Sequence, residues 1–248
     1  MISDIGTFIW KEAKEILLQR GNLRGGWFGL LIFVGVFGIF MPLQSGPSWV
    51  ESPIGLLYWS WVPFLLVSGV VADSFAGERE RHTLETLLAS RLSDRAILFG
   101  KLGAAIAYGW GFTLVSVLVG LITINLVYGQ GDLLMYPAAI GLGILALSFL
   151  IAALAAGLGV LVSLRAATVR QAQQIFSVAF FLLFIPLFAI PMLPETWRAQ
   201  AINWLMQNSG RISVGTVVLA VAGVLLLIDI ALVVAAMARF RRARLIID

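Results

Sequence analysis

The sequence predicts an all-α integral membrane protein with six transmembrane helices. Of its 248 residues, 60% are hydrophobic and only 12% are charged, whereas soluble domains are about 45–50% apolar. The mean hydropathy of +0.98 agrees with this composition. Long apolar runs recur along the chain, and basic residues collect between alternate runs. Both patterns are typical of helices that cross a bilayer repeatedly.

The spans are expected to be helical because lipid offers no partner for free backbone groups. Each span needs about 20 mostly apolar residues. The predicted spans cover approximately residues 25–43, 54–72, 102–127, 137–163, 175–193 and 214–236. A helical bundle of this size is most simply one unit, so residues 1–248 are predicted to form a single transmembrane domain.

The basic residues predict the orientation. With the N-terminus taken as inside, 15 of the 17 lysines and arginines fall on the inner side. Only Arg198 and Arg211 fall on the outer side. The positive-inside rule therefore places both termini in the cytoplasm. It also explains the isoelectric point of about 9.9 without a nucleic-acid partner.

The segment before the first span has an amphipathic pattern. In IGTFIWKEAKEILLQR the residues on one helical face are Ile5, Phe8, Ile9, Ala13, Ile16 and Leu17. Lys11, Lys14 and Glu15 fall on the other face. Within residues 1–24 we therefore predict a helix that lies on the cytoplasmic membrane surface and contacts lipid.

Composition argues against several kinds of chemistry. The chain has no cysteine and one histidine, His82. Disulfides and thiolate sites are excluded, and a protein-only zinc or haem site is not expected. A single acid within the spans cannot form the acid pair of an aspartyl protease. The sequence therefore predicts no catalytic residues, no metal site and no enzymatic activity of this chain.

The segment at 73–101 contains ten of the 30 charged residues. Five of them are acids, Asp73, Glu78, Glu80, Glu85 and Asp94, although an inner loop that only sets topology needs bases. Thr83 is a candidate N-cap for a short helix, LETLLAS, and the SDR run at 93–95 is a second start signal. We therefore expect a structured cytoplasmic connection.

The run GERERHTLETLLASRLSDRAILFGK resembles the signature loop of type-2 ABC transporter permeases. The matching residues are Glu78, Arg79, Glu80, Thr83, Leu84, Glu85, Leu87, Leu88, Gly100 and Lys101. His82 stands where that family usually has glycine, and Leu92 stands where a proline is common. The six spans, the N-terminal helix, an external helical segment before the last span and the polar run RAATVRQAQQ are also similar to this family.

The resemblance implies a membrane half-transporter, by analogy an exporter in the inner membrane of a prokaryote. Such a subunit pairs with a second permease subunit, identical or different, and with two separate ABC ATPase subunits that bind ATP and Mg²⁺. This chain should bind no cofactor. Its FGKL run at 99–102 lacks the phosphate-loop pattern because Arg95 replaces the required glycine and Leu102 the Ser or Thr.

A force-transmitting role would explain the charged segment. We expect the surface helix and Glu78 to Leu88 to dock in a groove of the ATPase, whose closure on ATP rocks the spans between inward and outward states. Two other classes stay open. A secondary transporter or channel would work without an ATPase, and a membrane scaffold would bind partners without turnover.

Two polar residues in the spans are candidates for the substrate pathway. Asp229 lies about 15 Å from Arg239 by helical rise, and a membrane-embedded acid can be a proton, cation or cationic-substrate site. A hydrogen bond to a neighbouring helix or a neutral carboxyl is the alternative. Asn125 lies near the outer end of the third span, where a hydrogen-bonding role at the membrane interface is the alternative. Small residues in the fourth span, such as Ala152 and Ala156, allow close helix contact and are candidates for a subunit interface, although such pairs also arise by chance in a span rich in alanine and glycine.

Overall fold

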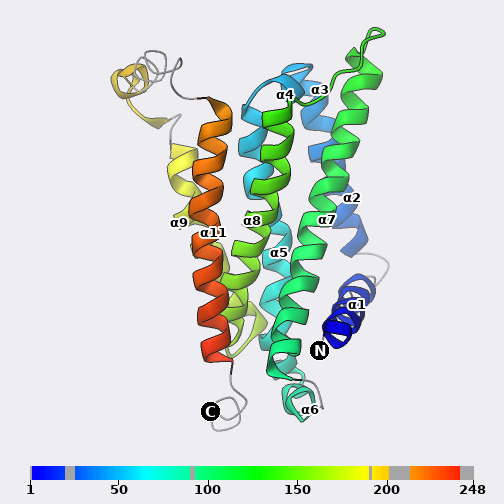
Figure 1. Cartoon of the computed structure of the whole chain (residues 1–248), viewed down its shortest axis with the longest axis vertical. Helices are drawn as coiled ribbons and strands as arrows, with labels where there is room; N and C mark the ends of the chain where they lie inside the picture. Colours follow the sequence, from blue (N-terminus) through cyan, green and yellow to red (C-terminus); the bar gives the residue numbers. More distant parts are fainter. Residues whose placement is uncertain (1, 20–25, 90–92, 190–191, 201–212, 241–248) are drawn as a thin grey trace.

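The computed structural model describes residues 2–19, 26–89, 93–189, 192–200 and 213–240. Long helices lie side by side in an elongated bundle, as Figure 1 shows. No strand occurs in these ranges. The all-α prediction is confirmed.

The first predicted span forms as three consecutive segments. They are α2 (Gly26–Gly35), the π-helical η1 (Val36–Phe40) and α3 (Met41–Ser45). The other elements are α1 (Ile2–Gln19), α4 (Ser48–Glu51), α5 (Ile54–Glu80), α6 (Leu84–Leu88), α7 (Asp94–Tyr128), α8 (Ala138–Ser163), α9 (Val169–Ala189) and α11 (Val214–Arg239).

Five candidate membrane spans are found among these described helices. They are Phe28–Ser45, Gly55–Glu80, Asp94–Tyr128, Ala138–Ser163 and Val214–Arg239. The predicted span at 175–193 corresponds to α9, whose apolar part Val169–Ile185 is shorter. Residues 190–191 of that span, and residues 201–212 of the external segment, lie outside the described ranges. A sixth span therefore stays a prediction.

Two helices extend beyond the predicted span limits. α5 continues to Glu80 instead of ending at 72, and α7 begins at Asp94 instead of 102. The extension of α5 forms because Phe75 and Ala76 continue its buried face, with both residues 0% exposed. The charged segment at 73–101 is therefore mostly helix, with only residues 81–93, including α6, connecting α5 to α7. We call residues 81–93 the α5–α7 connection.

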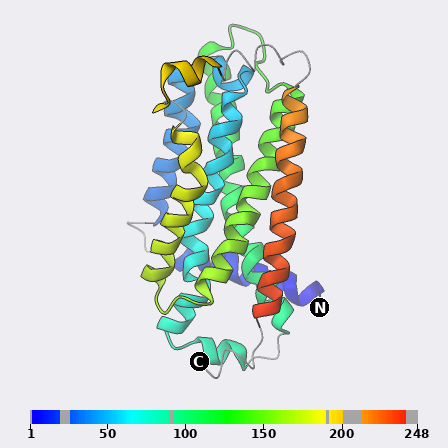
Figure 2. The same cartoon turned by 90° about the vertical axis from the view of Figure 1, so that its left-hand side faces the viewer.

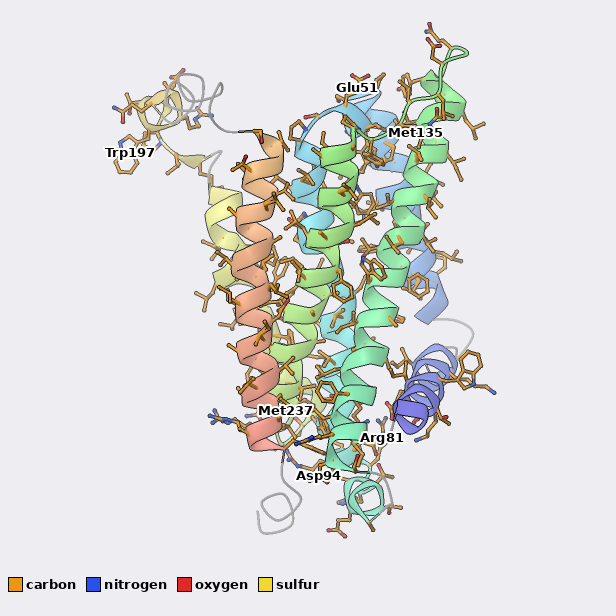
Figure 3. All side chains as sticks on the ribbon, viewed as in Figure 1. Glu51, Arg81, Asp94, Met135, Trp197 and Met237 are labelled. Atoms are coloured by element: carbon orange, nitrogen blue, oxygen red, sulfur yellow. The ribbon has the colours of Figure 1, made fainter. Side chains whose placement is uncertain are left out.

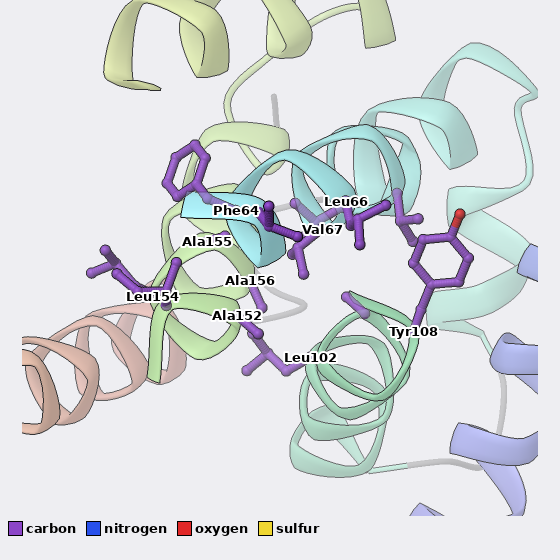
Figure 4. Close-up of a cluster of buried hydrophobic side chains, with 14 of the residues drawn as sticks. Phe64, Leu66, Val67, Leu102, Tyr108, Ala152, Leu154, Ala155 and Ala156 are labelled. Carbon is purple, nitrogen blue, oxygen red and sulfur yellow. The ribbon is translucent and has the colours of Figure 1, made fainter. Parts of the chain in front are cut away.

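Small residues set the contact between α5 and α8. A Cβ atom added at Gly159 would lie 2.1 Å from Cγ1 of Val71, so the two backbones approach closely there. Ala152, Ala155 and Ala156 of α8 are also buried. Figure 4 shows them among apolar side chains of α5 and α7. These small residues therefore allow close helix contact within the chain, and their role at a subunit interface stays a prediction.

α7 contacts the first span at the π-helical turn. A Cβ at Gly38 would lie 2.8 Å from Val119 Cγ1. The hydroxyl of Thr123 donates a hydrogen bond of 2.9 Å to the Gly38 carbonyl oxygen. The Thr123 hydroxyl thus gives the Gly38 carbonyl group a hydrogen-bond partner within the π-helical segment, where the backbone hydrogen-bond pattern differs from that of an α-helix.

The charged parts of the chain gather at one end of the bundle. α1, α6 and the last turn of α11 lie at the same end, and α1 runs across the direction of the long helices (Figures 1 and 2). Figure 3 places Arg81 and Asp94 at this end, and Glu51 and Met135 at the opposite one. We call it the charged end of the bundle.

Candidate functional site

Lys101 forms a buried ion cluster at the charged end. Its side chain is only 2% exposed, and its Nζ lies 3.4 Å from Glu12 Oε2 and 3.3 Å from Glu78 Oε1. The ammonium also lies 5.5 Å from the centre of the Phe75 ring, within cation–π range. One cation therefore joins α1, α5 and α7.

Glu12 reaches Lys101 because α1 packs closely on α7. Ile9, Glu12 and Ile16 share one face of α1. A Cβ at Gly103 would lie only 2.8 Å from Ile9 Cδ1, so glycine permits the approach. Sequence reasoning missed Glu12. The available signal was an acid at the i+3 position after Ile9 on the apolar face of an amphipathic helix.

The end of α5 forms a Schellman motif centred on His82. The N–H of Thr83 donates to the Glu78 carbonyl at 2.9 Å, and the N–H of His82 donates to the Arg79 carbonyl at 3.1 Å. His82 has a φ of 55°. This left-handed conformation is usually occupied by glycine. The position where the sequence departs from the resembled loop is therefore a true left-handed turn.

The Thr83 hydroxyl does not cap α6 as predicted. It donates to the carboxylate of Glu78, and it lies 3.3 Å from the Glu78 carbonyl oxygen. The left-handed turn at His82 directs the Thr83 hydroxyl back toward α5. The second predicted start signal is confirmed, because Ser93 Oγ accepts a hydrogen bond from the Ala96 N–H at 3.2 Å and begins α7.

Arg79 joins this end of α5 to the segment after α8. Its guanidinium donates to the carbonyl oxygen of Leu164 at 3.0 Å and to that of Ala166. These carbonyl groups lie just beyond the end of α8, where helical partners are missing. Arg79 thereby ties the end of α5 to the α8–α9 turn.

Ser163 makes a second link between the same helices. Its hydroxyl donates to the Ala72 carbonyl at 3.1 Å and accepts from the N–H groups of Phe75 at 2.9 Å and Ala76 at 2.8 Å. The Ser163 residue is 0% exposed. A side chain of α8 therefore belongs to the backbone hydrogen-bond network of α5.

Arg81 is paired with Asp73 across two turns of helix. The Arg81 Nη2 lies 3.1 Å from Asp73 Oδ2. Gly77 stands between them, where a Cβ would lie 1.9 Å from Asp73 Oδ1. Burial alone would lower the pKa of Arg81, but the hydrogen bond to Asp73 and the charges of Asp73 and Glu78 outweigh burial and raise the pKa. The guanidinium stays charged.

The predicted coupling residues divide into an outward and an inward group. Glu80, Thr83 and Glu85 are exposed. Glu78 and Arg79 are half-buried, and Leu84, Gly100 and Lys101 are buried. Leu87 and Leu88 belong to α6, but their side chains lie outside the described part of the structure. Among the predicted residues whose side chains are described, only the outward group is exposed enough to touch a partner.

A hollow of about 40 Å³ adjoins the ion cluster. Four acids and two bases line it, namely Glu12, Glu15, Asp73, Glu78, Arg81 and Lys101. Its volume suits about one or two water molecules. The described residues contain no group of three or more His, Cys, Asp or Glu side chains that could hold a metal ion.

The fold and this cluster can be compared with known proteins. The family model described as ABC-2 family transporter protein matches residues 51–238. The chain belongs to the ABC-2 transporter family. It is thus a multi-pass membrane permease subunit of an ABC transporter, which confirms the resemblance in the sequence. A search of curated proteins finds no significant match.

The family match covers the helices from α5 to α11. It therefore includes Glu78 and Lys101, whereas Glu12 lies before its first residue. In this ABC-2 protein the connection and both of its flanking helices fall within the shared region. The contact made by α1 comes from the segment that precedes the matched residues.

The two pathway candidates of this ABC-2 protein differ in their surroundings. The Asn125 amide donates to the carbonyl groups of Leu121 at 2.9 Å and Leu134 at 2.8 Å, and its oxygen accepts from the Leu134 N–H. Asn125 thus holds the loop between α7 and α8, and its contact with a substrate stays a prediction. Asp229 is 7% exposed, and neither of its carboxyl oxygens has a hydrogen-bond partner among the described residues.

Proposed function

We propose that the chain is the permease subunit of an ATP-driven exporter in a prokaryotic inner membrane. It works with separate ATPase subunits, which bind ATP and Mg²⁺, and with a second permease subunit that is identical or different. Six spans with both termini in the cytoplasm fit the charge asymmetry of the sequence. The charged end then faces the cytoplasm, and α1 lies at the lipid surface.

The ion cluster of Lys101 is the observation that carries this proposal. A surface loop that merely sets topology needs no buried ion pairs. Here the α5–α7 connection begins at the end of α5. That end of α5 is bonded to α1 and α7 through Lys101, and to the α8–α9 turn through Arg79. A force applied to the connection therefore acts on several helices together.

The outward and inward groups have different roles in this proposal. Glu80, Thr83 and Glu85 contact the ATPase. Glu78 and Lys101 are positioning residues, because they hold the connection against the bundle without reaching a partner. When the ATPase closes on ATP, the rigidly held connection moves and shifts the attached helices between inward and outward states.

Docking is tested with Glu80→Ala/Glu85→Ala. The matched control is Glu51→Ala/Asp132→Ala, which removes two exposed acids outside the connection. Tagged proteins are purified in mild detergent, and co-purifying chains are identified by mass spectrometry. We expect a Walker-motif ATPase with wild type and control, and at least a several-fold loss with the docking variant. Full recovery of the ATPase with the docking variant would refute the docking role of these acids.

A secondary transporter is the alternative that Asp229 favours, because a buried intramembrane acid is typical of ion-coupled transport. It predicts that well-folded wild-type protein brings down no ATPase and transports without nucleotide. Transport that requires ATP and a co-purifying ATPase excludes it.

A further inference from the structure

Asp229 lies in the middle of the seam between α8 and α11. The seam is formed on the α11 side by Val218, Ala222, Leu225 and Leu232, which pack against the buried core. Asp229 shares their helical face and is itself 7% exposed. Neither carboxyl oxygen has a hydrogen-bond partner among the described residues. The seam is otherwise apolar on this helix.

The register of the two helices identifies what faces Asp229. A Cβ at Gly143 would lie 3.2 Å from Val218, and a Cβ at Gly157 would lie 3.1 Å from Leu232. In both contacts the residue of α11 follows the residue of α8 by the same number of positions in the sequence. The two helices therefore run side by side in the same direction. The same offset places Leu154, which is 3% exposed, level with Asp229. The carboxyl group therefore meets an aliphatic surface.

Within the described residues, the helices that pack against α11 place no positive charge against Asp229. α8 has no ionisable side chain between Ala138 and Ser163. The titratable groups of α7, the other helix with several contacts to α11, are Asp94, Arg95, Lys101, Tyr108 and Tyr128. Lys101 is held by Glu12 and Glu78. On α11 itself, Arg239 is about 15 Å away by helical rise.

An ionised carboxylate in such a seam is strongly disfavoured. Removing an unpaired ion from water costs several kcal/mol even after the protein relaxes, and a membrane position adds to that cost. A metal ion would need oxygen ligands in addition to Asp229. The close contact of Gly157 with Leu232 leaves little space for water ligands there. A proton satisfies the same charge without additional volume.

We propose that Asp229 is a proton-binding site controlled by the packing of α11 on α8. The carboxyl group holds its proton while the seam is closed. When the helices separate and water enters, the O–H bond breaks, the proton passes to water and a carboxylate remains. The ionised group then opposes closure of the seam. This proposal does not depend on how the chain contacts an ATPase.

The protonated state can be observed by infrared spectroscopy of the full-length chain in lipid bilayers at neutral pH. The difference between wild type and Asp229→Asn should contain the carbonyl stretch of a neutral carboxyl group. The matched difference for Asp132→Asn, an exposed acid of the α7–α8 loop, should contain a carboxylate stretch. A carboxylate stretch for Asp229 would overturn the proposal and would indicate an ion pair or a hydrated site instead. Asp229→Leu provides a second reference spectrum if the Asn variant folds poorly.

The link between the proton and the seam needs a second measurement. The chain has no cysteine, so Leu147→Cys with Ala222→Cys introduces a single pair across the seam, at the same offset as the glycine contacts. We expect cross-linking to fall at least two-fold as the pH rises, relative to the same pair in an Asp229→Asn background. Equal pH dependence in both backgrounds would refute the linkage. Comparing the backgrounds removes the pH dependence of thiol reactivity itself.

Discussion

The ammonium group of Lys101 on α7 and the carboxylate of Glu12 on α1 form a buried ion pair between residues 89 positions apart in sequence. The pair fixes a helix that runs across the bundle to a helix that runs along it. Glu78 binds the same ammonium group, so the end of α5 is joined to α1 and α7 as well. Removing the cation would leave two acids close together and poorly hydrated.

Lys101→Met is therefore expected to lower the free energy of unfolding by about 3 kcal/mol, because breaking a buried pair leaves charges without compensation. Thermal unfolding in detergent measures the loss. The triple variant Lys101→Met/Glu12→Gln/Glu78→Gln should recover most of it, because the uncompensated charges are gone. An unchanged unfolding temperature for Lys101→Met would show that the cluster contributes nothing to stability.

His82→Gly is expected to stabilise the protein by about 1 kcal/mol. A side chain in the left-handed region carries a penalty of about 1–2 kcal/mol that glycine avoids. The same thermal measurement detects the gain. His82→Ala is the control, since alanine keeps the Cβ atom and should be no more stable than wild type. Equal gains from glycine and alanine would mean that the backbone conformation is not the cause.

Gly159→Ala is expected to destabilise the contact between α5 and α8 by about 1–3 kcal/mol through overpacking. The added Cβ would lie 2.1 Å from Val71 and 2.7 Å from Phe176. Gly223→Ala is the matched control, because nothing lies within 4 Å of its Cβ position. That control should be neutral or more stable, as alanine favours helix. Similar effects of the two variants would contradict the close approach at Gly159.

Ser163→Ala should lower the free energy of unfolding by about 1–3 kcal/mol, because it removes a buried hydroxyl group that makes three hydrogen bonds to the backbone of α5. Ser177→Ala is the comparison. That hydroxyl is exposed and donates only to a carbonyl group of its own helix, that of Gln173. We expect little change there. If both serines can be replaced without loss, the Ser163 hydroxyl does not bind α5 in the protein.

The helices themselves were largely predictable, because lipid demands long apolar segments whatever their neighbours are. Their limits at the charged end were not. Hydropathy falls at Asp73, yet α5 continues because Phe75 and Ala76 find a buried surface on other helices. That surface is made by segments far away in sequence. Local composition cannot report it.

The candidate site was likewise predictable in part. Resemblance to a known loop identified both Glu78 and Lys101, and it singled out His82 as the unusual residue. It did not show that the first two turn inward and that Glu12 completes their cluster. Pairing between α1 and α7 depends on how the helices cross, which a linear pattern of charges does not contain. The direction of the chain after α5, which carries Glu85, likewise depends on the turn at His82.

The hydroxyl of Ser163 also has a consequence for biosynthesis. Ser163 leaves the ribosome 88 residues after Phe75, whose N–H it accepts in the finished protein. α5 and α7 must therefore enter the membrane before α8 can supply this partner. The inner end of α5 reaches its final hydrogen bonding only when α8 has been inserted beside it. Truncation before α8 should accordingly leave that end of α5 open to quality-control proteases, even though the segment is hydrophobic enough to insert on its own.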